Sequence, residues 1–323
     1  MTALDPTPIR DPQRIRELVA AHGRWWHQIE LAPGIITPGD DSNRMKLPIL
    51  DELGLQASLR GLRVLDIGCS DGFFSFEVEK RGADVVAMDF VPETYTGFAT
   101  VKQILGSGVT YQMENVYNLA PERHGLFDVI LFMGVLYHLR KPLAALDSIR
   151  SVMKPGGELY VGTMLIDEYV QLPDGTVTTL EALNPALKGI PLWQAYPRDS
   201  LNGDYTNCFA PNMTALCAAL EEAQFEVTAT RIISMGGYAR AIATADLRAA
   251  KYQKLDTRLE KTPFDPSVPY FLDEEGAVHT VTGPHSRPQD QTLSHERARS
   301  SATGNADVVD QPRLADPNRS RQE

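Results

Sequence analysis

Apolar and polar positions follow two alternating rhythms over residues 63–160. Short runs of branched apolar residues, each closed by a turn, are separated by stretches with apolar residues three or four positions apart. The first rhythm predicts buried strands and the second predicts amphipathic helices. Strands that alternate with helices are typical of right-handed βαβ units, so the pattern predicts a doubly wound α/β fold with a mostly parallel sheet.

Seven strands are expected in this sheet. The fourth is almost continuously apolar, which indicates burial on both of its faces. Gly236 and Gly237 separate the last two strands and suit a hairpin turn, so the last strand is predicted to be antiparallel. In chain order the strands are placed at residues 63–70, 83–90, 108–114, 127–139, 158–166, 225–234 and 238–247.

The helical rhythm and its start and stop signals place the helices. Asp11 before Pro12 is typical of a helix start, and Gly23 is expected to end that first helix. The glycine pair that follows Pro155 is expected to stop a later one. The predicted helices cover residues 12–21, 45–59, 72–82, 92–106, 142–157 and 215–224.

Composition shifts divide the chain into three parts. Residues 1–59 are predicted to form a helical, aromatic segment in front of the main domain, which covers residues 60–252. Within that domain, residues 166–205 read as an irregular insertion. From 253 to 323, prolines and polar residues replace the apolar periodicity, and we expect this tail to be mostly disordered.

Composition and charge narrow the class of protein. Hydrophobic residues make up 43% and charged residues 23% of the 323 positions, and the net charge is −11. Such values are typical of a soluble globular protein. The acidic charge disfavours a nucleic-acid substrate without excluding one. Because the sequence has neither a signal peptide nor an apolar run long enough to span a bilayer, we expect a cytoplasmic protein without membrane contact, either a monomer or a homodimer.

Three cysteines argue against a disulfide framework and against a metal site. Cys69, Cys208 and Cys217 are an odd number, no pair has the CxxC spacing, and the histidines are not clustered at ligand spacing. We therefore expect no metal.

A glycine turn after the first strand is the strongest candidate for a ligand site. Gly68 permits a tight turn and Gly72 permits the next helix to start close to the sheet, so backbone there can approach a ligand closely. Asp89 ends the second strand, 23 residues after Asp66, near the spacing at which an acid reaches ribose hydroxyls. The turn lacks the dinucleotide fingerprint and carries Asp66, which suits a cationic ligand with an amino group.

Residues 64–75, VLDIGCSDGFFS, resemble the first motif of class I S-adenosylmethionine-dependent methyltransferases, and the likeness covers about residues 60–245. Ser70 stands where the family pattern has a further glycine. The resemblance implies S-adenosyl-L-methionine as cofactor, with Asp66 and Gly68 near its methionine part and Asp89 on its ribose. The expected cofactor-binding residues are Asp66, Gly68, Cys69, Ser70, Gly72, Asp89, Asn115, Val116, Tyr117, Met133 and Tyr137.

A second segment, GVLYH at residues 134–138 with Pro142 and Leu143 after it, resembles the tRNA wobble-uridine carboxymethyltransferases and their methyltransferase relatives. In the tRNA enzymes a tyrosine and an arginine hold the carboxylate of carboxy-S-adenosylmethionine, and Tyr137 and Arg240 match them. A lysine also contacts that carboxylate, and His27 stands near its position. Ordinary S-adenosylmethionine is therefore the predicted donor.

Methyl transfer needs an aligned acceptor and, for many acceptors, a base. His138 is the candidate base, and Tyr137 is the candidate orienting residue, because both follow the fourth strand at the carboxyl edge of the sheet. Trp26 and His27, with Trp25, are expected to form an aromatic lid. The remaining residues expected to bind the acceptor are Trp193, Tyr196, Arg198, Tyr205 and Arg240.

Four functions remain open at this point. The first is a methyltransferase acting on a small-molecule acceptor. The second is a tRNA wobble-uridine (carboxy)methyltransferase, which requires a basic patch from Arg123, Arg140, Lys141 and Arg150. The third is an enzyme that uses the same cofactor without methylating, such as a cyclase of its aminocarboxypropyl arm. The fourth is a binding module without catalysis.

Overall fold

The computed structural model describes residues 7–39, 46–198, 200–201, 203–233, 236–244, 270–272 and 278–280. It divides into two compact units, Met1–Lys251 and Tyr252–Glu323. In the second unit, β14 (Tyr270–Leu272) pairs antiparallel with β15 (Val278–Thr280). Most of the tail lies outside the described residues, so its disorder stays a prediction.

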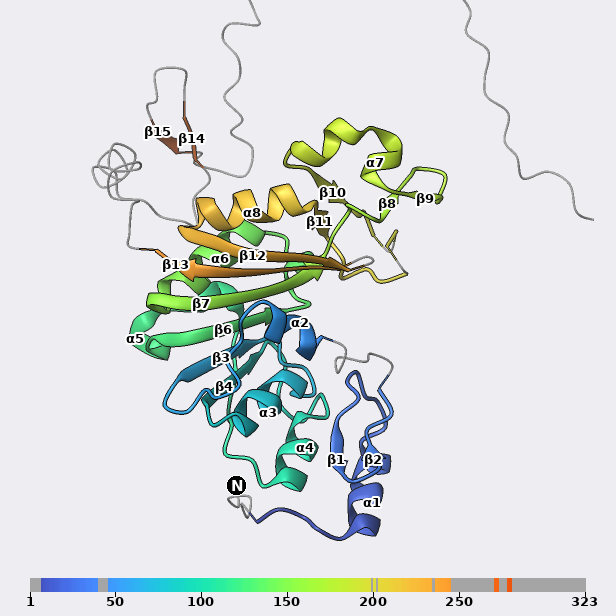
Figure 1. Ribbon diagram of the computed structural model, residues 1–323, viewed down its shortest axis with the longest axis vertical. Helices are drawn as coiled ribbons and strands as arrows, with labels where there is room; N and C mark the ends of the chain where they lie inside the picture. Colours follow the sequence, from blue (N-terminus) through green and yellow to red (C-terminus); the bar gives the residue numbers. More distant parts are fainter. Residues whose placement is uncertain are drawn as a thin grey trace, which may run out of the picture. The chain divides into compact units, whose positions relative to one another are not determined.

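A seven-stranded sheet runs through the first unit in the order β12-β13-β7-β6-β3-β4-β5 (Figure 1). The five strands from β7 to β5 in this order are parallel to one another. β13 is antiparallel to both of its neighbours, β12 and β7. The predicted fold class is thereby confirmed. The strands are β3 (Arg63–Ile67), β4 (Asp84–Asp89), β5 (Thr110–Met113), β6 (Phe127–Met133), β7 (Met153–Met164), β12 (Phe225–Ile233) and β13 (Gly236–Ala243).

Helices cover both faces of this sheet, and each face has its own core. α2 (Leu47–Glu52), α3 (Phe73–Lys80) and α4 (Phe98–Leu105) pack on one face, in front of the sheet in Figure 1. α6 (Pro142–Ser151) and α8 (Met213–Glu222) pack on the other. Alternate residues of each strand point to opposite cores, as the two-residue period of a strand requires. The short α5 (Pro121–His124) precedes β6.

The first helix, α1, confirms its sequence signals. It spans Pro12–His22, the Asp11 carboxylate accepts the backbone N–H of Gln13, and Gly23 ends it with φ of +85°. A short antiparallel hairpin of β1 (Glu30–Ala32) and β2 (Ile35–Ile36) follows, in a stretch where the sequence pattern suggests only an ordered loop.

Two helices on the front face are shorter than predicted. The helix expected over 45–59 is reduced to α2, because the chain turns at Gly54, whose φ is +102°. The helix expected over 92–106 begins only at Phe98, because the residues just before it are bonded to the glycine turn: Gly97 N donates to Asp71 and Thr96 Oγ1 donates to Ser70 O.

The Pro-Gly-Gly sequence at residues 155–157 was interpreted wrongly as the end of a helix. α6 ends at Ser151, and residues 155–157 lie within β7. They occupy an irregularity in its pairing with β6, where Phe127 faces Met153 but Val129 faces Glu158. The proline and glycines therefore form a bulge at the start of the strand, a position that such residues favour.

The insertion is ordered and continues beyond its predicted end. It contains two small hairpins, a short helix and a 3-10 turn around a separate apolar core. β11 contacts both β7 and the turn that follows β6, so the insertion lies at the carboxyl edge of the sheet. Its elements are β8 (Val170–Gln171), β9 (Val177–Thr178), α7 (Leu180–Leu183), η4 (Pro185–Gly189), β10 (Trp193–Ala195) and β11 (Phe209–Pro211).

Candidate functional site

The glycine turn between β3 and α3 has the geometry that its sequence predicts. Gly68 and Gly72 adopt φ values of +72° and +89°, which L-residues with side chains rarely adopt. A Cβ on Gly68 would lie 2.3 Å from Cγ2 of Val135, so the loop after β6 abuts this turn. Ser70, at the position where the family pattern has a glycine, also has a positive φ of +48°.

Asp89 holds the glycine turn against the end of β4. Its Oδ2 accepts the backbone N–H of Ser70 at 2.9 Å, and its Oδ1 accepts that of Phe90 at 2.7 Å. The backbone N–H groups of Gly68 and Cys69 donate to Met88 O. The structure therefore brings the turn and the strand-end acid together, as the sequence predicts. Val91 also directs its backbone N–H at this carboxylate, which leaves one of its four acceptor sites for a further donor.

Asp66 gives the turn a buried acid. It is 1% exposed, and Ser75 Oγ donates to its Oδ2 at 2.6 Å. Burial raises the pKa of Asp66 to about 7, and the Ser75 hydroxyl opposes that rise. Burial also raises the pKa of Asp89. A cationic group placed near these carboxylates would favour their ionised forms.

Phe90 is a residue that sequence reasoning missed. It follows Asp89 directly and its side chain is 76% exposed, although it is large and apolar. An exposed aromatic ring beside an acid that is predicted to bind ribose would offer a stacking surface to a planar base. The signal available in the sequence was an aromatic residue immediately after the strand-end acid.

The segment predicted to contact adenine forms η2 (Val116–Asn118), a 3-10 turn after β5. Asn115 caps that turn by accepting the backbone N–H of Tyr117. Val116 is buried in the core under α6, and the Tyr117 hydroxyl accepts the backbone N–H of Lys141. These contacts are structural, and a cofactor contact by the three residues stays a prediction.

Asp71 is the second residue that sequence reasoning missed. Its carboxylate is 2% exposed and accepts three backbone N–H groups: Trp26 at 2.6 Å, His27 at 2.8 Å and Gly97 at 2.8 Å. It thereby fastens the N-terminal segment and the start of α4 to the glycine turn. The sequence gives no sign of this role, because all three partners of Asp71 are distant from it in sequence.

The aromatic residues that were expected to form a lid have three different environments. Trp25 is buried, packs against Gly97 and donates its indole N–H to Val19 O, so it is a core residue. His27 is buried, 6.1 Å from the ring of Phe73. Trp26 is 49% exposed and is the ring of the three that remains most accessible to a ligand. A lid role for Trp26 and His27 stays a prediction.

Tyr137 and His138 lie in η3 (Leu136–His138), the 3-10 turn at the carboxyl end of β6. Their rings are 4.1 Å apart, and a Cβ on Gly134 would lie 3.8 Å from the Tyr137 hydroxyl. The insertion supports this turn, because Cys208 N donates to Tyr137 O at 2.8 Å. Burial lowers the pKa of His138, so its neutral imidazole is favoured at neutral pH.

Met133 and Thr163 line the same strand ends. Met133 closes β6, and a Cβ on Gly162 would lie 2.6 Å from its Cε. Thr163, one residue further along β7, is 4% exposed and its hydroxyl has no hydrogen-bond partner among the described residues. Sequence reasoning missed Thr163, because the strand pattern does not show whether a buried threonine hydroxyl has a hydrogen-bond partner.

The insertion residues expected to bind an acceptor are not equivalent. Tyr196 is buried in the insertion's own core and its hydroxyl donates to Gln194, so its position favours a structural role. Trp193 is half-buried on β10. Arg198 and Tyr205 are exposed, Tyr205 at 82%. Their contact with an acceptor stays a prediction.

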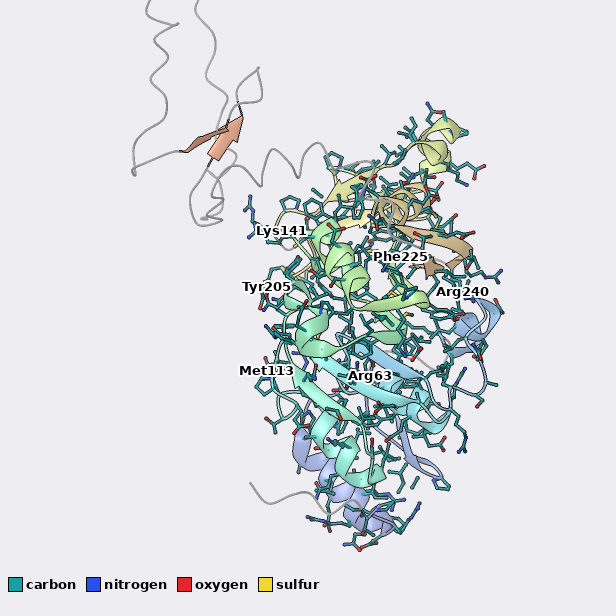
Figure 2. All side chains as sticks on the ribbon, turned by 90° about the vertical axis from the view of Figure 1, so that its left-hand side faces the viewer. Arg63, Met113, Lys141, Tyr205, Phe225 and Arg240 are labelled. Carbon is teal, nitrogen blue, oxygen red and sulfur yellow. The ribbon has the colours of Figure 1, made fainter. Side chains whose placement is uncertain are left out.

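Arg240 is not brought together with Tyr137. Its guanidinium forms an ion pair with Glu158 and packs near Gly54, after α2. In Figure 2, which looks toward the amino end of β3 at Arg63, Arg240 lies on the side of α2, whereas Lys141 and Tyr205 lie on the opposite side. The loose alignment that paired Arg240 with Tyr137 is therefore not supported by their positions.

Parts of the chain are similar in sequence to known methyltransferases. A ubiquinone biosynthesis O-methyltransferase of Xanthomonas campestris pv. campestris (strain B100) is 34% identical over 149 residues, which are 46% of this chain and 59% of that protein. A tRNA U34 carboxymethyltransferase of Campylobacter hominis is 38% identical over 110 residues, which are 34% of this chain and 38% of that protein. The chain thus spans less than two thirds of the length of these relatives.

A solved structure and a family model extend the comparison beyond these segments. The N-terminal domain of EvdMO1, crystallised with SAH bound, superposes with a TM-score of 0.51 at 20% identity, covering 74% of this chain and 98% of that one, and so shares the fold. None of the helices that the structure describes has the length and apolarity to cross a bilayer. The methyltransferase domain model matches residues 41–230, more than half of the chain, and the protein therefore belongs to the methyltransferase domain family.

Proposed function

We propose that the protein is an S-adenosylmethionine-dependent methyltransferase that acts on a small-molecule acceptor. The observation that carries this proposal is the junction of the glycine turn with Asp89, where a buried carboxylate, exposed Phe90 and positive-φ glycines meet at the carboxyl ends of the strands. Ligands bind at this edge in open α/β sheets.

The residues present fit the cofactor. Asp89 retains acceptor capacity for a ribose hydroxyl, Phe90 offers a face for adenine, and the acid Asp66 suits the ammonium group. Gly68 and Gly72 adopt the positive φ values that this tight turn requires. When bound, the cofactor supplies a methyl group already activated by its sulfonium, so the chain has to bind, align and exclude water.

Calorimetry with S-adenosylmethionine and with S-adenosylhomocysteine tests the proposal on the full chain. We expect micromolar binding of both ligands to the wild type and a loss of about 100-fold or more in Asp89→Ala, because the variant removes both the charged acceptor for the ribose and the carboxylate that holds the glycine turn. Asp84→Ala is the matched control, since Asp84 lies at the opposite end of β4 and its side chain is 76% exposed. Failure of the wild type to bind either ligand would refute the proposal.

The charge distribution favours a small acceptor over tRNA. Of the four residues that a tRNA-binding patch requires, Arg123 forms an ion pair with Glu114, and Arg150 donates to the backbone oxygens of Gln224 and Thr244. Both guanidinium groups are therefore committed within the fold, in a chain whose net charge is −11.

A tRNA substrate keeps one argument, the partial likeness to the tRNA U34 carboxymethyltransferase. Filter binding of unmodified tRNA at low salt separates the two acceptors. We expect no saturable binding at micromolar protein. Tight binding that weakens steeply with salt and is lost in Arg140→Ala, a variant of an exposed residue, would favour tRNA instead.

A further inference from the structure

The insertion places a hydroxyl and a carboxylate in line with His138. Thr206 Oγ1 lies 2.9 Å from His138 Nδ1 and 2.7 Å from Asp204 Oδ1. Asp204 Oδ1 also accepts the backbone N–H of Thr206 at 2.8 Å. The three side chains form a continuous chain of hydrogen bonds from the rim of the insertion to the imidazole.

The proton positions in this chain follow from the number of donors. A threonine hydroxyl has one proton, and an ionised carboxylate only accepts. The hydrogen bonds from Thr206 lower the pKa of Asp204, so Asp204 is ionised at neutral pH and accepts the hydrogen bond that the Thr206 hydroxyl donates. Thr206 Oγ1 then accepts from His138, whose proton must lie on Nδ1. Nε2 is left with its lone pair.

We infer that Asp204 and Thr206 are positioning residues that hold His138 in the Nδ1–H tautomer, so that Nε2 accepts the proton of the methyl acceptor. The inference rests on the proposed function, because the acceptor is the source of that proton. It also gives the insertion a role in the chemistry, in addition to any contact with the acceptor.

Methyl transfer with His138 as base involves only the cofactor, the acceptor and these residues. A lone pair of the acceptor atom forms the new bond to the methyl carbon, the methyl–sulfur bond breaks with its electron pair on sulfur, and the acceptor proton moves to His138 Nε2. The positive charge that leaves the sulfonium thus ends on the imidazole, which the carboxylate of Asp204 stabilises through Thr206. Water then removes the proton.

The groups around His138 agree with this role. Burial lowers the pKa of His138, while a hydrogen bond to the Thr206 backbone and the charge of Asp204 oppose that fall. Tyr137 packs against the imidazole ring, and Cys208 Sγ contacts His138 O rather than the ring. Asp204 is an ionised side chain that Thr206 links to this histidine.

A second turn of the same construction serves as a control. Asp174 Oδ1 accepts both the backbone N–H and the hydroxyl of Thr176, at 2.9 and 2.7 Å. It closes the β8–β9 hairpin, and no histidine bond to Thr176 is present among the described residues. Any effect that belongs to the turn motif itself should occur equally in both places.

Histidine-selective 15N NMR on the full chain, saturated with S-adenosylhomocysteine, tests the inference. His138→Asn assigns the signal. We expect the Nδ1–H tautomer in the wild type and in Thr206→Ser, which keeps the hydroxyl, and a shift toward the Nε2–H tautomer in Thr206→Val. In Asp204→Asn the pKa of His138 should fall, because the nearby negative charge is lost. Thr176→Val and Asp174→Asn should leave the signal unchanged.

Diethyl pyrocarbonate gives a second readout, since it acylates an unprotonated imidazole nitrogen that is accessible. Peptide mapping should show slower modification of His138 in Thr206→Val and restored modification in Thr206→Ser. An Nε2–H tautomer in the wild type, or an unchanged tautomer in Thr206→Val, would overturn the inference. Because S-adenosylhomocysteine binding is measured separately, this outcome is distinguishable from failure of the proposed function.

Discussion

Two turns of this molecule are built around aspartates, and they use the carboxylate in opposite ways. In the glycine turn, Asp66 and Asp71 are 1% and 2% exposed, and Asp71 bonds to backbone groups more than 25 residues away. In the insertion turn, Asp204 lies at the rim and bonds to Thr206, two residues on. The buried carboxylates of the glycine turn are part of the scaffold, whereas the half-buried Asp204 keeps a charge that can act on a neighbour.

The titration of the two turns differs accordingly. Burial raises the pKa of Asp66 to about 7, while the hydrogen bonds from Thr206 lower the pKa of Asp204. The difference teaches that the same residue type provides rigidity at one turn and a fixed negative charge at the other. Only burial and the identity of the donors distinguish them.

Asp71→Ala should give the largest effect, because it leaves three backbone N–H groups without their acceptor. We expect the free energy of unfolding to fall by about 3–6 kcal/mol, and Tm to fall by roughly 10 °C or more. Asp71→Asn should be intermediate, since its amide retains one acceptor oxygen. A smaller loss in Asp71→Ala than in Asp204→Ala, by thermal melting, would break the comparison.

Gly68→Ala should follow in size. Its added Cβ meets Cγ2 of Val135 at 2.3 Å, and φ of +72° is strained for alanine. We expect a loss of about 2–4 kcal/mol, measured by urea denaturation. The double variant Gly68→Ala/Val135→Ala relieves the clash but not the backbone strain. Its loss in free energy of unfolding should therefore be smaller than the sum of the losses in the two single variants. Exact additivity would show that the two loops do not touch.

The pH dependence sharpens the comparison at Asp66. With a folded pKa of about 7 against an ordinary value of 3.8, the native state holds a proton that the unfolded chain releases. This group's stabilisation is complete below pH 3.8, declines as pH rises toward 7 and is lost above it. Asp66→Asn should flatten that decline in Tm recorded between pH 4 and 8. Parallel curves for the two proteins would contradict the assignment.

Asp174→Asn should have the smallest effect. Its hairpin is exposed, and Thr176 forms no hydrogen bond with a histidine among the described residues. We expect unchanged Tm and unchanged affinity for S-adenosylhomocysteine in calorimetry. If Asp174→Asn shifted the titration of His138 as much as Asp204→Asn, the turn motif alone, and not its contact with His138, would explain both.

The accuracy of sequence reasoning differed between local and distant features. The sheet strands, the αL glycines and the meeting of the glycine turn with Asp89 were predictable, because strand period, turn chemistry and parallel topology determine them together. The N-terminal hairpin and the true end of α6 were not, because short strands and a bulge at residues 155–157 have no distinct periodicity.

By itself, the sequence determined the fold class, the family resemblance and the position of the candidate cofactor edge, since these depend on local periodicity and on glycines that only certain turns require. The tertiary structure alone decided that Asp71 holds the N-terminal segment, that Arg240 pairs with Glu158, and that Thr206 bonds to His138. Each is a contact between residues 40 or more positions apart. Such pairings depend on how the chain packs, and packing leaves no spacing in the sequence from which to read them.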